Sequence, residues 1–314
     1  MSDLDRLLTA VSPQKVAVIG DIILDEHVYC DVLGISPEDD LAPKLRVSSR
    51  VYKLGGAANT AHNLKTLGVE QVYLFGRRGN GRDTFFHFDM LCTEADIIAQ
   101  LCHSDVDIPV KSRYLTRMGR HVARVDCEQI SPMRKEETAE ILKLIDECGP
   151  FRFIVVSDYA KGTITEELMQ SLGTRGCLIV DPKIKDFRKY GNVHVITPNE
   201  KEWEACMLYA GKAKNVVVTL SGVGCRWVGC DGYAVCNVRT REVGDPTGCG
   251  DSFIAGLTYA LMAGLAMPDA CCFANAVGAC AYDHTGVHAV TREEVQAELK
   301  TFEYGREGCK PLQE

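Results

Sequence analysis

The segment that points most directly to chemistry is a glycine-rich turn leading into a long apolar stretch, Gly244-Asp-Pro-Thr-Gly-Cys-Gly-Asp-Ser-Phe253. Small residues in such a turn let successive backbone N–H groups point toward one cavity. The start of a helix adds positive partial charge, so the turn can hold an anion such as phosphate. Asp251 would repel that phosphate unless it takes a proton from an attacking hydroxyl group. The combination indicates phosphoryl transfer to an alcohol; the alternative is that Asp251 only caps the helix.

The commoner phosphate-binding patterns do not account for this turn. The sequence contains no GxxxxGK[ST], and Gly248-Cys-Gly250 lacks the third glycine of a dinucleotide-binding turn. The HRD and DFG triplets of protein kinases are also missing. A kinase with this sequence must belong to another lineage.

Apolar runs with strand character alternate with helical stretches along the chain. This alternation predicts a mainly parallel sheet with helices on both faces, and ligands in such folds lie beyond the carboxyl ends of the strands. The expected strands are Val16–Ile19, Val72–Phe75, Phe153–Val156, Cys177–Val180, Val193–Ile196 and Val216–Leu220. The expected helices are Ala57–Leu67, Glu166–Leu172, one after Pro198, and one after Gly250 that includes the apolar run Phe253–Met267.

Two stretches, His27–Arg50 and Lys111–Asp126, have strand character but are interrupted by polar residues. We expect them to form a small antiparallel β lid over the site, with strands in residues 25–52 and 111–126. No internal repeat or low-complexity linker divides the chain, so residues 1–314 are expected to form a single domain.

Composition narrows the class of protein. The 314 residues are 46% hydrophobic, enough for a sizeable core, and the formal net charge of -8 with no dense Lys/Arg run argues against a nucleic-acid partner. The longest apolar run is shorter than the ~20 residues that a membrane span needs. The 15 cysteines include no CxxC pair, and no export signal begins the chain. We therefore expect a cytoplasmic protein with free thiols and no membrane partner.

Three motifs carry a resemblance to a known family: Gly55-Gly-Ala-Ala-Asn59, Thr197-Pro-Asn-Glu-Lys-Glu202 and Gly248-Cys-Gly-Asp251. In type and order they are similar to the signatures of the ribokinase-like (PfkB) sugar kinases, over most of the chain. Within that family the sequence most resembles kinases of heptose 7-phosphate, which serve lipopolysaccharide synthesis. The segments concerned are Val18–Asp25, Ile35–Glu38, Ser157–Gly162 and Asp181–Lys183. The resemblance implies a ribokinase-like three-layer α/β sandwich and an enzyme that uses ATP and Mg²⁺.

The resemblance also implies roles at the acceptor side of the site. Asp251 would be the general base, while Gly248, Cys249 and Gly250 would donate backbone N–H groups to the transferring phosphoryl group. Asp25, Gly55, Gly56 and Asn59 would bind the sugar, although a turn residue and a helix cap remain the alternatives for Asp25 and Asn59. Candidate cations for the sugar's own phosphate are Lys161, Lys183, Arg113, Arg117 and Arg124, unless these are solvated surface residues.

On the nucleotide side, the resemblance assigns the residues Asn199, Thr219, Ser221, Gly222, Gly224 and Asn275. Glu202 would act on Mg²⁺ through water, and Asp245 would help to hold a monovalent cation such as K⁺. Without the family, Glu202 is part of an acidic first helical turn and Asn275 is a buried residue that caps local backbone.

The sequence departs from the heptose-kinase pattern at several places. Asp39–Lys44 replaces small apolar and proline residues in the lid, Leu54 replaces a proline, and Asp83–Ser104 does not match. Cys249 replaces an alanine; a thiol at a helix start can have a lowered pKa and be open to oxidation, whereas an inert small residue is the simpler interpretation. Heptose kinases often carry a second, nucleotidyltransferase domain, and because this chain ends at Glu314 we expect that activity to be absent.

The leading hypothesis is ATP-dependent phosphorylation of the anomeric O1 of D-glycero-D-manno-heptose 7-phosphate, which gives the 1,7-bisphosphate. The alternative within the family is a kinase for another sugar, sugar acid, sugar phosphate or nucleoside. A catalytically silent binding protein is a third hypothesis, against which the retained Asp251 and its glycines argue. Relatives often pair through their lid sheets, so we also expect a homodimer.

Overall fold

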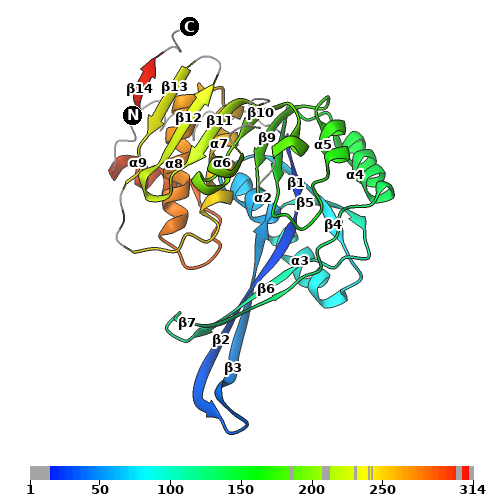
Figure 1. Cartoon of the computed structure of the whole chain (residues 1–314), viewed down its shortest axis with the longest axis vertical. Coiled ribbons are helices and arrows are strands. Elements are labelled where there is room, and N and C mark those ends of the chain that lie inside the picture. Colours follow the sequence, from blue (N-terminus) through cyan, green and yellow to red (C-terminus); the bar gives the residue numbers. More distant parts are fainter. Residues whose placement is uncertain are drawn as a thin grey trace.

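The computed structural model describes residues 15–183, 187–206, 213–229, 232–239, 241 and 243–301, and the backbone of 306–310. Within these residues a 10-stranded sheet forms the body, in the order β14-β13-β12-β11-β10-β9-β8-β1-β4-β5 (Figure 1). The strands from β11 back to β5 pair in parallel, and β12, β13 and β14 pair antiparallel. Their bounds are β1 Lys15–Gly20, β4 Gln71–Arg78, β5 Ile98–His103, β8 Phe153–Ser157, β9 Cys177–Asp181, β10 Val193–Ile196, β11 Ala213–Thr219, β12 Cys225–Gly229, β13 Gly232–Cys236 and β14 Arg306–Lys310.

Helices cover both faces of this sheet because its central strands are apolar on both sides. In β1, Val16 and Val18 face one core while Ala17 and Ile19 face the other. The first core is shared with α2 Ala57–Thr66, α3 Arg82–Glu94, α7 Cys249–Met262, α8 Met267–Tyr282 and α9 Arg292–Thr301. The second is shared with α4 Lys135–Cys148, α5 Glu166–Leu172 and α6 Glu200–Cys206. The expected three-layer α/β sandwich is therefore confirmed.

One expected helix is divided. The apolar run after Gly250 does not continue to Met267, because α7 ends at Met262 and α8 begins at Met267. Gly264 lies in the left-handed region with φ of 87°. The Leu265 N–H donates to the Ala260 carbonyl at 3.1 Å, which closes the helix end as a glycine-terminated cap. Apolar periodicity continues through this cap, so hydrophobicity alone did not reveal it.

The lid is a separate four-stranded sheet in the order β3-β2-β6-β7. Its strands are β2 Ile22–Ser36, β3 Asp39–Gly56, β6 Val110–Thr116 and β7 His121–Cys127, and they project from the body as a long arm (Figure 1). The two outer pairings are antiparallel, as expected, but β2 and β6 pair in parallel. The chain passes through β4 and β5 of the main sheet before β6, so it enters the lid again from the body.

Two further expectations can be compared with the described residues. Every cysteine whose side chain the structure describes is a free thiol. None of their helices is long and apolar enough to cross a membrane.

Candidate active site

Asp251 lies in the first turn of α7, where the chain passes the carboxyl ends of the central strands, and only 1% of its surface is exposed. Its Oδ2 accepts a hydrogen bond from Asn59 Nδ2 at 2.9 Å, and its Oδ1 accepts one from the Tyr159 hydroxyl at 2.8 Å. Burial raises the pKa of Asp251 to about 6, against the lowering effect of these two donors. Such a carboxylate is ionised at neutral pH and is still a useful proton acceptor.

The turn before α7 is built around Gly248. This residue is the N-cap, with φ of 82° and ψ of −3°, and a Cβ added there would lie 2.9 Å from Asn59 Nδ2. Only glycine fits both requirements. The Cys249 N–H already donates to the Pro246 carbonyl at 3.2 Å, so the Gly248 and Gly250 amides remain as the candidate phosphoryl donors. Burial and nearby carboxylates raise the pKa of Cys249 to about 12, which removes the expectation of a reactive thiolate.

A cavity of about 580 Å³ opens beside the start of α7. It brings together all the residues that the sequence assigned to the nucleotide, namely Asn199, Thr219, Ser221, Gly222, Gly224 and Asn275. Gly248, Cys249 and Gly250 also line it, together with Glu202 and Lys183. Sites predicted from distant parts of the chain therefore converge on one concave surface.

The Asn199–Glu202 pair forms a reciprocal helix cap at the start of α6. Glu202 Oε2 accepts from the Asn199 N–H at 2.9 Å, and the Glu202 N–H donates to Asn199 Oδ1 at 3.0 Å. This is the capping-box arrangement. Glu202 Oε1 in turn accepts from Lys183 Nζ at 3.0 Å. Lys183 thus lies on the nucleotide side of the site rather than with the other predicted cations.

A further carboxylate, Asp181, lines the same cavity and was not singled out by the sequence analysis. Burial and the charges of Asp251 and Glu202 raise the pKa of Asp181 well above its usual value. Asp181 and Glu202 both line the cavity, and their carboxylates are oxygen donors of the kind that Mg²⁺ prefers. The residues present therefore fit the divalent ion that the family implies.

Two other predicted residues make local structural contacts. Asp245 Oδ1 accepts from the Thr247 N–H at 2.9 Å, and Oδ2 accepts from the Gly286 N–H at 2.7 Å. Asn275 Nδ2 donates to the carbonyls of Cys236 at 3.0 Å and Asn237 at 2.9 Å. Asn275 therefore caps local backbone while it lines the cavity.

Asp25 and Gly55 face each other across the base of the lid. A Cβ on Gly55 would overlap Asp25 Oδ2, and Gly56, the N-cap of α2, has a positive φ of 57°. The carboxylate of Asp25 forms a buried ion pair with Arg113 of β6. The Gly-Gly pair thus lets the lid strand approach Asp25 closely.

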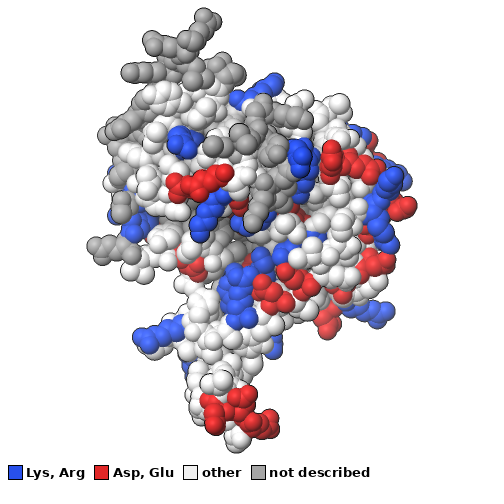
Figure 2. Space-filling model, viewed as in Figure 1, with Lys and Arg blue, Asp and Glu red and all other residues white. Residues whose placement is uncertain are grey.

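Four side chains form what we call the cationic cluster: Lys111, Arg113, Lys161 and Arg124. Lys111 Nζ lies 5.0 Å from the centre of the Tyr159 ring. Burial lowers the pKa of Lys111, and the charges of the other three act in the same direction, opposed by Asp25. Figure 2 shows Lys and Arg side chains gathered beside acidic ones where the lid meets the body.

Three of the four side chains in the cationic cluster are ion-paired with carboxylates, including Arg113 with Asp25. One other predicted cation lies outside the cluster. Lys161 Nζ contacts Glu128 at 2.7 Å, and Arg124 Nε contacts Asp126 at 2.7 Å. Arg117 instead pairs with Asp31 on the outer lid, with 70% of its side chain exposed. It is a surface residue, as the alternative interpretation held.

Asp21, Tyr159 and Lys111 were missed by the sequence analysis. Asp21 is buried and accepts from the backbone N–H groups of Tyr159 and Lys161 at 2.9 Å, and from that of Thr163 at 3.0 Å. It therefore fixes the loop that places Tyr159 on Asp251. Asp21 and Tyr159 lie inside segments that carried the resemblance, whereas no local pattern marks Lys111.

The chain is similar in sequence to a family of known enzymes. Residues 13–293 match the model of the pfkB family carbohydrate kinase. The chain is 32% identical to the bifunctional protein HldE of Hyphomonas neptunium over 99% of its own length and 69% of that relative's length. It is also 32% identical to HldE of Campylobacter jejuni, over 90% of its own length and 64% of that relative's.

Solved structures share the fold at lower identity. Phosphofructokinase-2 from Escherichia coli, in complex with potassium, superposes with a TM-score of 0.76 at 18% identity, covering 93% of this chain and 99% of that one. A carbohydrate kinase from Agrobacterium tumefaciens gives a TM-score of 0.69 at 19% identity, covering 91% and 97%. By sequence over most of its length, and in agreement with its fold, the chain belongs to the pfkB family of carbohydrate kinases, enzymes that transfer a phosphoryl group to a sugar.

Proposed function

We propose that the chain transfers the terminal phosphoryl group of ATP to the anomeric O1 of D-glycero-D-manno-heptose 7-phosphate. The observation that carries the proposal is the cationic cluster beside Asp25, at the base of the lid. A neutral sugar does not require several ammonium and guanidinium groups near its hydroxyl-binding residues, whereas a sugar phosphate does. The HldE relatives supply the choice of heptose phosphate among sugar phosphates.

We assign ATP and the sugar to different parts of the site. ATP would occupy the 580 Å³ cavity, with its phosphates toward the start of α7 and the Gly248 and Gly250 amides. The sugar would lie between Asp25, Asn59 and Asp251, with its 7-phosphate toward Lys111 and Lys161. Asp251 would take the proton from O1 as the phosphoryl group arrives.

The contacts around Asp251 prepare it for this role. Tyr159 and Asn59 each donate to one carboxylate oxygen, so the side chain is held in a single orientation. Mg²⁺, held near Asp181 and Glu202, would supply positive charge to the phosphates when bound. Asp245 would help to hold a monovalent cation. Its hydrogen bond from the Gly286 N–H fixes the neighbouring segment beside that position.

A second candidate is a kinase of another sugar phosphate, such as fructose 6-phosphate. Asp39–Lys44 contains three charged residues where heptose kinases have small apolar and proline residues, and this lid segment is mostly exposed. Such an enzyme would use the same cationic cluster and the same base. It would differ in the hydroxyl groups contacted by the lid.

An acceptor panel separates the two candidates. ATP consumption should be measured with heptose 7-phosphate, fructose 6-phosphate, ribose and adenosine at equal concentrations. The proposal predicts the highest kcat/KM with heptose 7-phosphate, and lower activity when the 7-phosphate is removed enzymatically. Higher kcat/KM with ribose or adenosine would contradict the role given to the cationic cluster.

We further propose that two copies of the chain pair through their lids in the cytoplasm. Exposed apolar side chains gather on β2 and β3: Val32, Leu33, Ile35, Leu41, Val47 and Val51. Acidic side chains gather at the tip of the arm (Figure 2). Pairing would cover the apolar side chains and an edge strand. Sedimentation at micromolar concentration should give a dimer, and a monomer alone would refute this pairing.

A further inference from the structure

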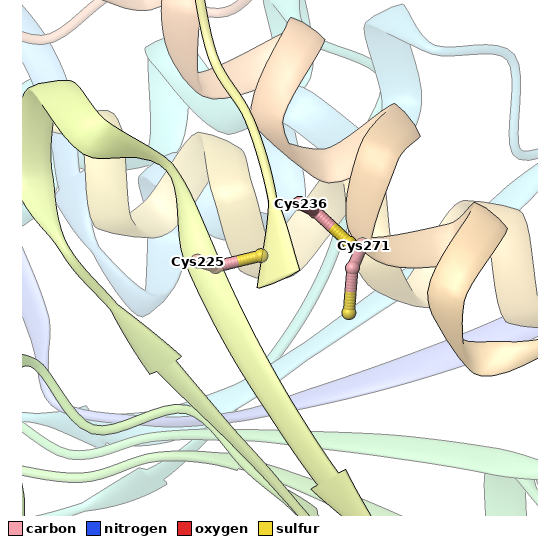
Figure 3. A group of neighbouring side chains, drawn as sticks. All are labelled: Cys225, Cys236 and Cys271. Carbon is pink, nitrogen blue, oxygen red and sulfur yellow. The ribbon is translucent and has the colours of Figure 1, made fainter. Parts of the chain in front are cut away.

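Three cysteines from three different elements meet beneath the nucleotide cavity. Cys225 begins β12, Cys236 ends β13, and Cys271 lies on α8. All three are fully buried, and their sulfur atoms lie within 4.8 Å of one another. Figure 3 shows the sulfurs at the corners of a triangle between the strand pair and the helix.

The surrounding structure holds this triangle in place. Cys225 and Cys236 face each other directly across the β12–β13 hairpin. A Cβ on Gly224, which has φ of 112°, would overlap the Cys236 carbonyl oxygen, so glycine permits a close approach there. Asn275 Nδ2 donates to the same carbonyl at 3.0 Å and lies one helical turn after Cys271.

We propose that Cys225, Cys236 and Cys271 bind one soft metal ion of the Zn²⁺ or Cu⁺ class. Buried cysteines usually act as small apolar side chains. These three differ because their sulfurs lie within 4.8 Å of one another, close to the spacing of sulfurs around a shared ion. A metal–sulfur bond of about 2.3 Å places trigonal sulfur atoms about 4.0 Å apart, so the triangle needs to contract by less than about 1 Å. Thiolates select soft ions, and binding releases the thiol protons to solvent.

The proposed metal site lies next to the nucleotide cavity. Gly224, next to Cys225, and Asn275 both line that cavity. A metal that ties β12, β13 and α8 together would therefore make the cavity floor more rigid.

The test uses the full chain, purified with a reductant and freed of metal by chelation. One arm adds Zn²⁺ and the other adds Cu⁺ under anaerobic conditions, each followed by gel filtration and metal analysis. We expect one ion per chain to be retained in at least one arm, with a rise in Tm. Cys236→Ala and Cys271→Ala should each lower the affinity by more than about 100-fold, because changes beyond the ligands already cost 10- to 100-fold.

Cys280→Ala is the matched control, because Cys280 is also buried on α8 but lies outside the triangle. It should bind metal as the unaltered chain does. X-ray absorption of the loaded, unaltered chain needs no variant and should show three sulfur neighbours at about 2.3 Å, joined by one lighter ligand when the ion is four-coordinate Zn²⁺. A ligand set made mainly of nitrogen and oxygen would place the ion elsewhere, for example at His284, His288 and Glu294. That result, or the absence of any retained ion, would overturn the proposal.

Discussion

Replacing Asp251 with asparagine tests the role of the proposed base while preserving the shape of its side chain. A positioned general base contributes about 10²- to 10⁴-fold to a rate, equivalent to about 3–5 kcal/mol of activation free energy. We therefore expect Asp251→Asn to lower kcat by about 10²- to 10⁴-fold. The affinity for ATP should stay nearly unchanged, because the cavity is lined by other residues.

The same substitution should leave the protein folded. A pKa raised from 3.8 to about 6 means that the buried charge costs about 3 kcal/mol at neutral pH, and asparagine removes that cost. Against this, an amide facing the donors Asn59 or Tyr159 loses a hydrogen bond, which costs about 1–3 kcal/mol. The two effects nearly offset each other. We expect the free energy of unfolding to change by less than about 2 kcal/mol.

The assay compares kcat with the Kd for ATP and with thermal denaturation, on the same preparation. Asp83→Asn is a suitable control, because Asp83 is also in the first turn of a helix, is exposed, and lies outside the site. It should leave all three quantities unchanged. A kcat for Asp251→Asn within tenfold of the unaltered enzyme would refute the general-base role, and an equal loss of ATP binding would indicate a structural carboxylate instead.

Four further predictions concern the same site and the loop that supports it. Because Asp251 must be ionised to act and its pKa is about 6, kcat/KM should fall tenfold per pH unit below about pH 6. Tyr159→Phe removes a hydrogen-bond donor that lowers the pKa of Asp251, so the fall in kcat/KM at acid pH should begin at a higher pH. An unchanged pH profile would contradict the role of this contact. Lys111→Met should lower kcat/KM for the sugar phosphate by about 10- to 100-fold, from lost charge-assisted contacts. Arg117→Met, a surface control, should have no effect, and equal losses would remove Lys111 from the phosphate site. Asp21→Ala should lower the free energy of unfolding by about 3 kcal/mol, measured in urea, because buried N–H groups lose their acceptor; a change below 0.5 kcal/mol, the size of an ordinary surface effect, would refute this.

Much of the body could be predicted because its signals are local. Val16–Ile19 and the other continuous apolar runs became buried parallel strands, since such strands are covered on both faces. Glycines at 55, 56 and 248 marked places where a side chain would collide with Asp25, Asp21 or Asn59. These positions were found through motifs, and the structure supplies the steric reason.

Long-range pairings were not visible in the sequence. Lys111 and Arg113 are placed by the parallel pairing of β2 with β6, which follows from the chain path and not from a local pattern. The cysteine spacing indicated no zinc motif, because such motifs rely on nearby ligands, whereas Cys225, Cys236 and Cys271 meet only through packing. The capping box of Asn199 and Glu202 shows that one motif can be both a helix start and a candidate metal position.

Phosphorus-31 NMR of the reaction tests the central claim most directly. The purified chain should be incubated with ATP, Mg²⁺ and heptose 7-phosphate, and the products followed until ATP is consumed. We expect ADP and, in equal amount, a new phosphate resonance coupled to the anomeric proton, while the original 7-phosphate resonance persists. Phosphorylation at another carbon, or ADP formed with only inorganic phosphate, would contradict it.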